Sequence, residues 1–364
     1  MRIGIIFHKN PLGPPTGIDL VRLRAIAGGL RRKGIDAEII APIERESLLD
    51  GFIPVRPPAA LDKPGSYDLV KTSYHYSILL LGKFTGPVVS RIVRVVDDRL
   101  PERDEPFREK LLQCQKIISA RARVVSLNNI ENLQRWNHFF GGSQRTILVP
   151  TGCPATIPVP HENPFSRKTA PVLFLGSIAA PRMIQMLNDA ARNLEGLYTI
   201  HLVGANKTLM YGGRGWSPPL DERIVDHGEI SEEKIWDYIR HASVGLALAT
   251  GPHAFDNDLA KIYNYLRGGL PVLSEEPVLN NHLIRQTNFG KIIGYGDVNG
   301  LVAGVQELVT KPPAHGQEVM DFMVREHSWE KRVETYIELF ETLLRELKGC
   351  RIIDGPHLKP ILER

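Results

Sequence analysis

The sequence predicts an α/β protein with two Rossmann-like lobes. Apolar runs of strand length alternate with amphipathic helical segments along most of the chain, which is typical of parallel sheets covered by helices. A proline-dense segment, residues 150–171, divides this alternation into two series. At 364 residues the chain also exceeds what one ordinary hydrophobic core supports, so two domains are expected.

The first series begins with a buried strand at residues 2–7. A Gly/Pro-rich loop follows from Asn10 to Gly17, then a helix with apolar residues at helical spacing between Leu20 and Leu30. Gly34 ends this helix, and residues 37–41 form the next strand, which completes a βαβ unit. The remaining predicted elements are strands at 69–72, 88–92, 124–127 and 146–149 and a helix at 106–122.

The second series begins after the proline-dense linker. Its predicted strands are residues 172–175, 198–203, 227–230, 244–247 and 271–273, and its predicted helices are 184–192, 232–242 and 301–309. A long amphipathic helix at 328–348 ends the series, with an apolar stripe made of Trp329, Val333, Tyr336, Ile337, Phe340 and Leu344. The predicted domains are 1–165, 166–327, the helix 328–348 packed back on the first domain, and a tail, 349–364.

The segment from Asp256 to Leu273 is the most informative for function. A short helix ends there at the glycine pair 268–269 and is followed at once by a buried strand. The glycines suit a left-handed helix end and allow close backbone approach to a ligand. Polar groups recur at the start and along one side of the helix, at Asp256, Asp258, Lys261 and Asn264. Such strand–helix–strand crevices hold nucleotides in open α/β sheets.

Composition restricts the class of protein. Apolar content of 43% and charged content of 24% are typical of a soluble globular chain. The three cysteines, Cys114, Cys153 and Cys350, are far apart and show no zinc or disulfide spacing, which fits a reducing compartment. The first residues have no signal-peptide pattern and no apolar run reaches 18 residues, so we expect a cytoplasmic protein.

The net charge of +4 is unevenly distributed. Residues 1–160 hold 23 Lys/Arg and 15 Asp/Glu, a balance of +8, and the remainder holds 22 and 26, a balance of −4. A basic first half suggests an anionic partner, either a membrane surface or a phosphorylated substrate. A merely solvated surface is an equally good explanation.

Four segments, in order, resemble the two-lobed GT-B glycosyltransferases, specifically the large retaining family with an E-x7-E motif (family 4-like). KIYNYLRGGLPVL (261–273) is similar to the family's K-x-x-E-Y-x-x-x-G-x-P-V-V. ILVPTGC (147–153) resembles its entry to the linker, and HGEISEEKIWDYIRHASVGLAL (227–248) resembles a block of its second lobe. The tail from His327 to Leu344 resembles the family's terminal helix, which crosses back to the first lobe.

The resemblance implies that a nucleotide-sugar donor binds mainly to the second lobe, in a cleft between the lobes. The sugar would pass to an acceptor hydroxyl held by the first lobe, with its anomeric configuration kept. Neither a metal nor a cofactor is implied, because helix N-termini and basic side chains neutralise the departing diphosphate.

The resemblance also assigns residues around the helix of the segment 256–273. Asp256 and Asn264 stand on the two glutamate positions of E-x7-E, which contact the donor sugar and the ribose hydroxyls. Asp256 keeps a carboxylate on a shorter arm, whereas Asn264 loses the charge. Lys261 stands where related sequences carry a phosphate-side lysine. A helix cap at Asp256 and solvent exposure of Asn264 and Lys261 are the alternatives.

Further donor-side candidates follow the first strands of the second lobe. The family has an arginine directly after a glycine and a lysine five residues on, both at the diphosphate. Here Gly176 is followed by Ser177, and Arg182 keeps the second charge. Lys207, after Gly204, is a weaker candidate. A surface arginine at a helix start is the alternative for Arg182, although the helix dipole disfavours it.

The first lobe supplies a catalytic candidate, further donor-side glycines and the acceptor-side candidates. His75 follows a strand where family members place a histidine near the reacting sugar, although a packing role is the alternative. Gly13 and Gly17 could turn backbone amides toward the diphosphate. Asp97 and Asp98 could accept from a sugar hydroxyl, but pairing with nearby arginines is slightly favoured. The basic run between Arg91 and Arg108 has few aromatic residues, which argues against nucleic acid and allows contact with anionic lipid.

These observations predict a cytoplasmic glycosyltransferase of hexosyltransferase type that can touch the inner face of the membrane. The donor would be a UDP- or GDP-type nucleotide sugar, and the acceptor a glycan, a lipid-linked or a small molecule. Two alternatives remain open. One is a nucleotide-sugar epimerase of the same fold. The other is a non-catalytic binding module, which the residues Ser177 and Asn264 leave possible.

Overall fold

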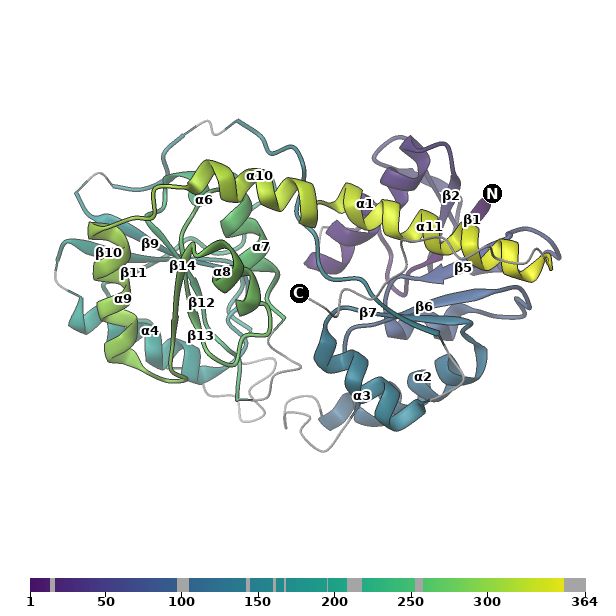
Figure 1. The fold of residues 1–364 in the computed structure, drawn as a ribbon, viewed down its shortest axis with the longest axis horizontal. Helices are drawn as coiled ribbons and strands as arrows, with labels where there is room; N and C mark the ends of the chain where they lie inside the picture. The colour runs from purple at the N-terminus through teal and green to yellow at the C-terminus, as the bar shows by residue number, and fades with distance from the viewer. Residues whose placement is uncertain are drawn as a thin grey trace. The chain divides into compact units, whose positions relative to one another are not determined.

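The computed structural model contains two separate, mainly parallel sheets, each with its own helices (Figure 1). The structure describes residues 1–13, 17–96, 105–141, 145–159, 162–166, 168–194, 196–207, 218–252 and 258–349. Among these residues, no helix combines the length and the apolar character needed to span a membrane. Cys114 and Cys153 are buried and form no disulfide among the described residues, and Cys350 lies outside them.

The first sheet has eight strands in the order β3-β4-β2-β1-β5-β6-β7-β8. Their bounds are β1 Arg2–Ile6, β2 Asp36–Ile40, β3 Ser47–Leu49, β4 Ile53–Arg56, β5 Leu69–Thr72, β6 Val88–Ile92, β7 Val124–Leu127 and β8 Arg145–Leu148. The strand β1 pairs in parallel with both β2 and β5, so that Ile3 faces Ala37 on one side and Leu69 on the other. The short β3 pairs antiparallel with β4, which was not predicted.

Helices cover the crossovers of this sheet. They are α1 Ile18–Arg32, α2 Glu105–Arg121 and α3 Ile130–Phe140, with short 3₁₀ turns η1 Pro58–Asp62 and η2 His75–Leu80. The predicted helices 20–30 and 106–122 correspond to α1 and α2. The helix α3 was not predicted; it begins at Asn129, whose side chain accepts a hydrogen bond from the backbone N–H of Asn132.

The C-terminal helix α11, Trp329–Leu347, packs on the first elements of the chain, as predicted. A Cβ atom built at Gly29 of α1 would lie 2.5 Å from Cγ2 of Val333, so the two helices touch at a position that only glycine fits. The ammonium of Lys71 on β5 lies 4.7 Å from the ring centroid of Tyr336. Trp329, Val333, Tyr336 and Phe340 of the predicted stripe are buried, as are Leu339 and Leu343.

The second sheet has six parallel strands in the order β11-β10-β9-β12-β13-β14. The strands are β9 Ala170–Leu175, β10 Tyr198–Val203, β11 Ile224–Asp226, β12 Val244–Ala247, β13 Val272–Glu275 and β14 Gly290–Ile293. The helices are α4 Pro181–Asn193, α6 Ile235–His241, α7 Ala260–Arg267, α8 Asn281–Thr287, α9 Val298–Thr310 and α10 Gly316–His327.

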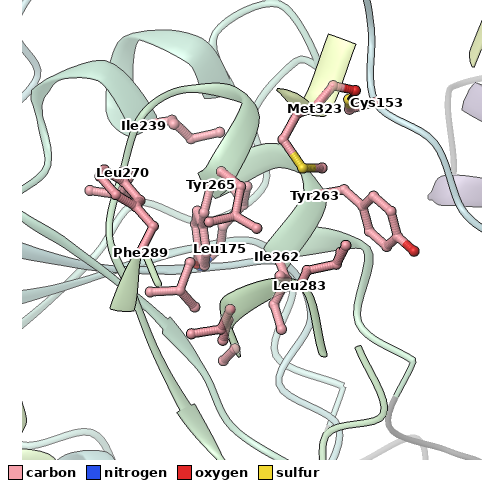
Figure 2. Packing of buried hydrophobic residues seen from close by; sticks show 14 of the residues in the cluster. Cys153, Leu175, Ile239, Ile262, Tyr263, Tyr265, Leu270, Leu283, Phe289 and Met323 are labelled. Carbon is pink, nitrogen blue, oxygen red and sulfur yellow. Dashed lines mark hydrogen bonds between the residues drawn. The ribbon is translucent and has the colours of Figure 1, made fainter. Parts of the chain in front are cut away.

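Two apolar clusters fill the opposite faces of the second sheet. Alternate residues of β9 point to opposite clusters: Val172 and Phe174 pack with α4 and α9, and Leu173 and Leu175 pack with α6 and α7. Figure 2 shows the second of these clusters, in which Tyr265 and Ile262 of α7 lie among residues from the neighbouring elements. The thiol of Cys153, in the segment between the sheets, lies 3.6 Å from the carbonyl oxygen of Met323 on α10.

The strand predicted at residues 227–230 was wrong. The strand β11 ends at Asp226. The backbone N–H of His227 then donates to the carbonyl of Leu202 on β10, and the carbonyl of Gly228 accepts from the N–H of Gly204 in the loop after β10. Gly228 has φ +65°, which ends the extended conformation. The His227 imidazole makes hydrogen bonds on both of its nitrogen atoms, which fixes this turn in place.

The chain also separates into two compact units, which are Met1–Ser90 with the residues from Glu330 onward, and Arg91–Trp329. This grouping follows compactness rather than sheet membership, because the first sheet contributes strands on both sides of residue 90. The predicted boundary near residue 165 therefore stays a prediction. Between β8 and β9, the described residues form no helix and no strand of the sheets, in agreement with a proline-dense linker.

Candidate functional site

The strand order of the second sheet reverses between β9 and β12. The chain proceeds from β9 outward to β10 and β11, and then returns to place β12 on the other side of β9. The pairing of these two strands covers only Val244 with Val172 and Gly245 with Leu173. Beyond this point their carboxyl ends separate, and such a reversal is where open α/β sheets bind ligands.

Tyr265 of α7 occupies the point where β9 and β12 separate. Its hydroxyl accepts a hydrogen bond from the backbone N–H of Leu175 (2.8 Å) and lies 3.2 Å from the carbonyl oxygen of Leu173 and 3.3 Å from that of Leu246. A Cβ atom at Gly245 would lie 2.6 Å from the Tyr265 ring, so glycine is required beneath it. Where β9 and β12 no longer pair, backbone groups of both strands lack a strand partner. The Tyr265 hydroxyl lies within hydrogen-bonding distance of these groups and thereby fixes α7 over the crevice.

Lys261 stands one helical turn before Tyr265 and on the same face of α7. Its ammonium lies 3.5 Å from the ring centroid of Phe174, and a Cβ atom built at Gly176 would lie 3.9 Å from it. The helix α7 begins after Leu259, which makes no side-chain cap, and the positive end of the helix dipole lies at the same place. A lysine and a helix N-terminus thus lie together beside the end of β9.

Burial lowers the pKa of Lys261 to about 7, because its half-buried ammonium loses contact with water. Within the described part of the chain, no carboxylate forms an ion pair with it. A lowered lysine pKa of this kind, beside a glycine turn at the carboxyl edge of a sheet, marks a candidate site for an anion. A bound phosphate group would restore the charged form of the lysine.

Two glycine turns form the wall of this site. Gly176 follows β9 with φ +97°, and Gly204 follows β10 with φ +141°. A Cβ atom at Gly204 would lie 2.4 Å from the carbonyl oxygen of Gly176, so the two turns are in direct contact. Close backbone approach of this kind is what a diphosphate-binding loop requires.

The predicted donor-side residues Gly176, Ser177, Lys207 and Lys261 are brought to one edge of the sheet. Ser177 is exposed beside Gly176, and the backbone N–H of Lys207 donates to the carbonyl of Ile178 (2.9 Å). Asn264 is half-buried on α7, and none of the described residues bonds to its side-chain amide. Their roles toward a ligand stay predictions.

Arg182 lies at the same edge but is engaged with other groups. Its guanidinium forms a bidentate ion pair with the buried Glu275 at the end of β13 and donates to the carbonyl of Ala249 after β12. The guanidinium carbon lies 4.2 Å from the ring centroid of Tyr295. The side chain is 24% exposed, so part of the guanidinium remains open to solvent.

The first sheet has its own reversal of strand order, between β1 and β5. Gly17 ends the loop after β1 and begins α1 with φ 74° and ψ −177°, a conformation open to glycine alone, and a Cβ atom there would meet nothing within 4 Å. His75 follows β5 and is buried, with its ring 3.9 Å from that of Tyr74 and 4.4 Å from that of Tyr76. Gly13 lies before Gly17 in the segment between β1 and α1. Their proposed roles stay predictions.

Three predicted residues lie outside the described parts of the chain: Asp97, Asp98 and Asp256. The E-x7-E correspondence of Asp256 and Asn264 is therefore untested. Among the described residues, no group of three or more His, Cys, Asp or Glu side chains is arranged to hold a metal ion.

Sequence reasoning missed Tyr265 and Glu275. Tyr265 follows Asn264 directly in the quoted motif, but an apolar position in a helix gives no sign that its hydroxyl bonds a neighbouring strand. An acidic residue two positions after the apolar run 271–273 was the available signal for Glu275. Its partners come from three other elements and could not be inferred from spacing.

Comparison with known proteins agrees with this architecture. No family model matches the chain, and no curated protein matches it in sequence. Solved structures do match. Sucrose-phosphate synthase from Thermosynechococcus elongatus superimposes with a TM-score of 0.72 at 14% identity, covering 95% of this chain and 99% of that one.

Two further structures match at similar coverage. Anabaena HepE, solved in complex with UDP-glucose, matches with a TM-score of 0.71 at 14% identity, covering 94% of this chain and 100% of that one. WaaG, a glycosyltransferase of lipopolysaccharide biosynthesis, matches with a TM-score of 0.62 at 13% identity, covering 96% of this chain and 100% of that one. The chain therefore has the fold of the GT-B glycosyltransferases, with two lobes that are each built on a parallel sheet.

Proposed function

We propose that the protein is a glycosyltransferase that moves a hexose-type sugar from a nucleotide-sugar donor to an acceptor hydroxyl with retention of configuration. The observation that carries the proposal is the anion site at the β9–β12 reversal. There the ammonium of Lys261 lies beside Gly176 with no carboxylate partner among the described residues. Anabaena HepE, one of the structures with the same fold, was solved in complex with UDP-glucose, which is a donor of this class.

In such a sugar transfer, this site would stabilise the leaving nucleoside diphosphate. Lys261 and the N-terminal end of α7 would supply positive charge where negative charge develops, and such preorganised groups are worth several kcal/mol in a dry site. The glycine turns at 176 and 204 would let backbone amides approach the phosphates. We infer that charge neutralisation by these groups replaces a metal ion.

The acceptor would be bound by the other sheet. Asp97 and Asp98, which lie outside the described residues, are the candidates for binding it. Beside the β1–β5 reversal, His75 would accept or hold a proton near the reacting sugar, and Gly17 would turn backbone amides toward the donor diphosphate. We propose a glycan, lipid-linked or small-molecule acceptor, in line with the family resemblance of the sequence.

Binding and turnover test the proposal separately. In a thermal-shift assay, UDP or GDP should raise the melting temperature of the protein and the matching nucleoside should raise it less, because a ligand of the folded state stabilises it by mass action. Incubation with the corresponding nucleotide sugars should release nucleoside diphosphate in the presence of acceptor mixtures. Retention would be read by NMR from the anomeric configuration of the product. No shift with any nucleoside diphosphate would contradict the proposal.

The two alternatives give different outcomes in the same experiments. An epimerase would interconvert the donor sugar without an acceptor. A binding module would show the thermal shift without any turnover, and Asn264 in place of a glutamate is the feature that favours it. Neither Lys261 nor the glycine turns distinguish these three activities, because all of them need the diphosphate bound.

We also infer peripheral contact with an anionic membrane surface through α2. Lys110, Lys116, Arg121 and Arg123 are exposed on or directly after this helix. Glu109 is the exposed acid among residues 107–123, and the Phe107 side chain is 47% exposed. Each basic residue near an anionic surface contributes roughly 1 kcal/mol. Cosedimentation with phosphatidylserine vesicles should fall with added salt, and equal binding to neutral vesicles would contradict this inference.

A further inference from the structure

Glu275 collects hydrogen bonds from four donors although it is wholly buried. The carboxylate ends β13 and is 0% exposed. One oxygen accepts from the backbone N–H of Gly296 (2.8 Å) and the other from that of Ala249 (2.7 Å). The guanidinium of Arg182 donates to both oxygens.

These bonds join four elements at the carboxyl edge of the sheet. Ala249 follows β12, Gly296 follows β14, and Arg182 stands in the first turn of α4, after β9. The side chain of Arg182 therefore reaches from the β9 side across the end of β12, where it also donates to the Ala249 carbonyl oxygen. Tyr295 lies along the guanidinium and limits its movement. A buried carboxylate with every bond satisfied holds its partner in one geometry.

The arrangement leaves Arg182 partly available at this edge. Two backbone N–H groups share the negative charge of Glu275, so the arginine is not the only group that compensates it. The arginine remains 24% exposed while the carboxylate is inaccessible, so an anion can approach the cation but not its partner. The first turn of α4 follows the Gly176 turn, which is the wall of the anion site around Lys261.

We propose that Glu275 is a positioning residue that fixes the Arg182 guanidinium as a contact for the diphosphate of the donor. This assignment rests on the proposed function. Glu275 acts through Arg182 and does not touch the ligand itself. A mobile arginine side chain loses rotamer freedom when a ligand fixes it, and Glu275 removes that cost before the ligand arrives.

A purely neutralising role of Glu275 would have the opposite effect on diphosphate binding. If Glu275 merely neutralised Arg182, the pair would keep the arginine away from phosphate, and removing the negative charge would free it. Glu275→Gln would then tighten the binding of a nucleoside diphosphate. A positioning role requires that the same substitution weakens it.

The experiment compares the full-length protein with Glu275→Gln by calorimetric titration with UDP, GDP and their nucleosides. We expect the affinity for the nucleoside diphosphate to fall by about tenfold and the affinity for the nucleoside to stay within twofold. Glu276→Gln is the matched control, because it removes the same charge from the next, exposed residue and should leave both affinities unchanged. Arg182→Lys, which keeps the charge but loses the bidentate geometry, should resemble Glu275→Gln.

A purely structural role would lower the melting temperature without changing the ratio of diphosphate to nucleoside affinity, so that ratio is the decisive measurement. The double variant Glu275→Gln/Arg182→Lys should lose no more affinity than either single variant, because both act through one contact. Unchanged or tighter diphosphate binding by Glu275→Gln would overturn the assignment while the proposed function stands. Absence of diphosphate binding by the unaltered protein would overturn both.

Discussion

Lys261 keeps an ammonium group where water reaches it only partly and where no described carboxylate pairs with it. Its pKa of about 7 in the folded chain is below the ordinary value of 10.5. Between these values the unfolded chain binds more protons than the folded chain, so the free energy of unfolding rises with pH in that window. The full slope is about 1.4 kcal/mol per pH unit.

Replacing the lysine should remove this dependence. Urea unfolding of the unaltered protein at pH 7 and pH 9 should show a gain of about 2 kcal/mol at the higher pH, and Lys261→Met should show much less. The same variant should bind nucleoside diphosphate more weakly at pH 7, as measured by calorimetry. Lys207→Met, at the same edge, is the comparison. An equal gain with pH in both variants would mean that Lys261 is charged in the folded protein.

Tyr265 has a hydroxyl that serves three backbone groups of β9 and β12. Tyr265→Phe should therefore lower the free energy of unfolding by about 1–3 kcal/mol, because it leaves the buried N–H of Leu175 without a partner. Chemical denaturation measures this directly. Tyr198→Phe removes a hydroxyl that bonds none of the described residues and should change stability by less than about 0.5 kcal/mol. Similar losses in both variants would contradict the role given to Tyr265.

At the scale of elements, a histidine pair joins β10 and β11 to α6. Nδ1 of His201 lies 2.9 Å from Nε2 of His227, and Nδ1 of His227 lies 3.1 Å from the Tyr238 hydroxyl. Phe165, from the segment between the sheets, packs against the His201 ring at 4.6 Å. Burial lowers the pKa of His201 to about 4 and also lowers that of His227. The contact therefore depends on neutral imidazoles.

Acidification should weaken this contact. The unfolded chain protonates His201 near pH 6.5, whereas the folded chain resists protonation down to about pH 4, so the free energy of unfolding falls through that window, by up to ~3 kcal/mol. The loss is absent above pH 6.5, where both states are neutral. Unfolding curves of the unaltered protein and His201→Gln at pH 7 and pH 5 measure the difference. If the variant lost as much stability on acidification as the unaltered protein, carboxylates rather than His201 would be responsible.

At the scale of the whole molecule, the last helix completes the core of the first ninety residues. Gly29 of α1 and Val333 of α11 meet at a spacing that excludes a Cβ atom at residue 29. Gly29→Ala should destabilise the protein by about 1–3 kcal/mol through overpacking. Adding Val333→Ala should recover part of the loss, since it frees the contested space. Melting temperatures of the single and double variants test this, and additive losses would contradict direct contact between the two positions.

Sequence periodicity predicted most of the sheet elements. The strands at 69–72, 88–92, 124–127, 198–203 and 244–247 have the predicted bounds, because buried parallel strands are short apolar runs between glycine and proline signals. The short strands β3 and β4, the edge strand β14 and the helices α3, α8 and α10 were not predicted. The strand β11 was displaced because the turn at Gly228 and the His227 bonds depend on residues distant in sequence.

The candidate site was predicted only in part. The glycine turns could be located from the sequence because glycines at strand ends are a local pattern, and Lys261 because it stands on the polar side of the short helix in the segment 256–273. The burial of Lys261 could not, since it depends on Phe174 from another strand. The ion pair of Arg182 with Glu275 joins residues 93 positions apart, and neither side chain carries a local sign of the other.

By itself, the sequence determined the two series of strands and helices, the linker between them and the placement of glycines at strand ends, because these follow from the side chains of neighbouring residues. The tertiary structure decided which polar groups meet at the carboxyl edge of the second sheet and which of them are buried. It did so because strand order brings together residues that the chain separates, and because burial changes the charge of a side chain only once its surroundings have formed.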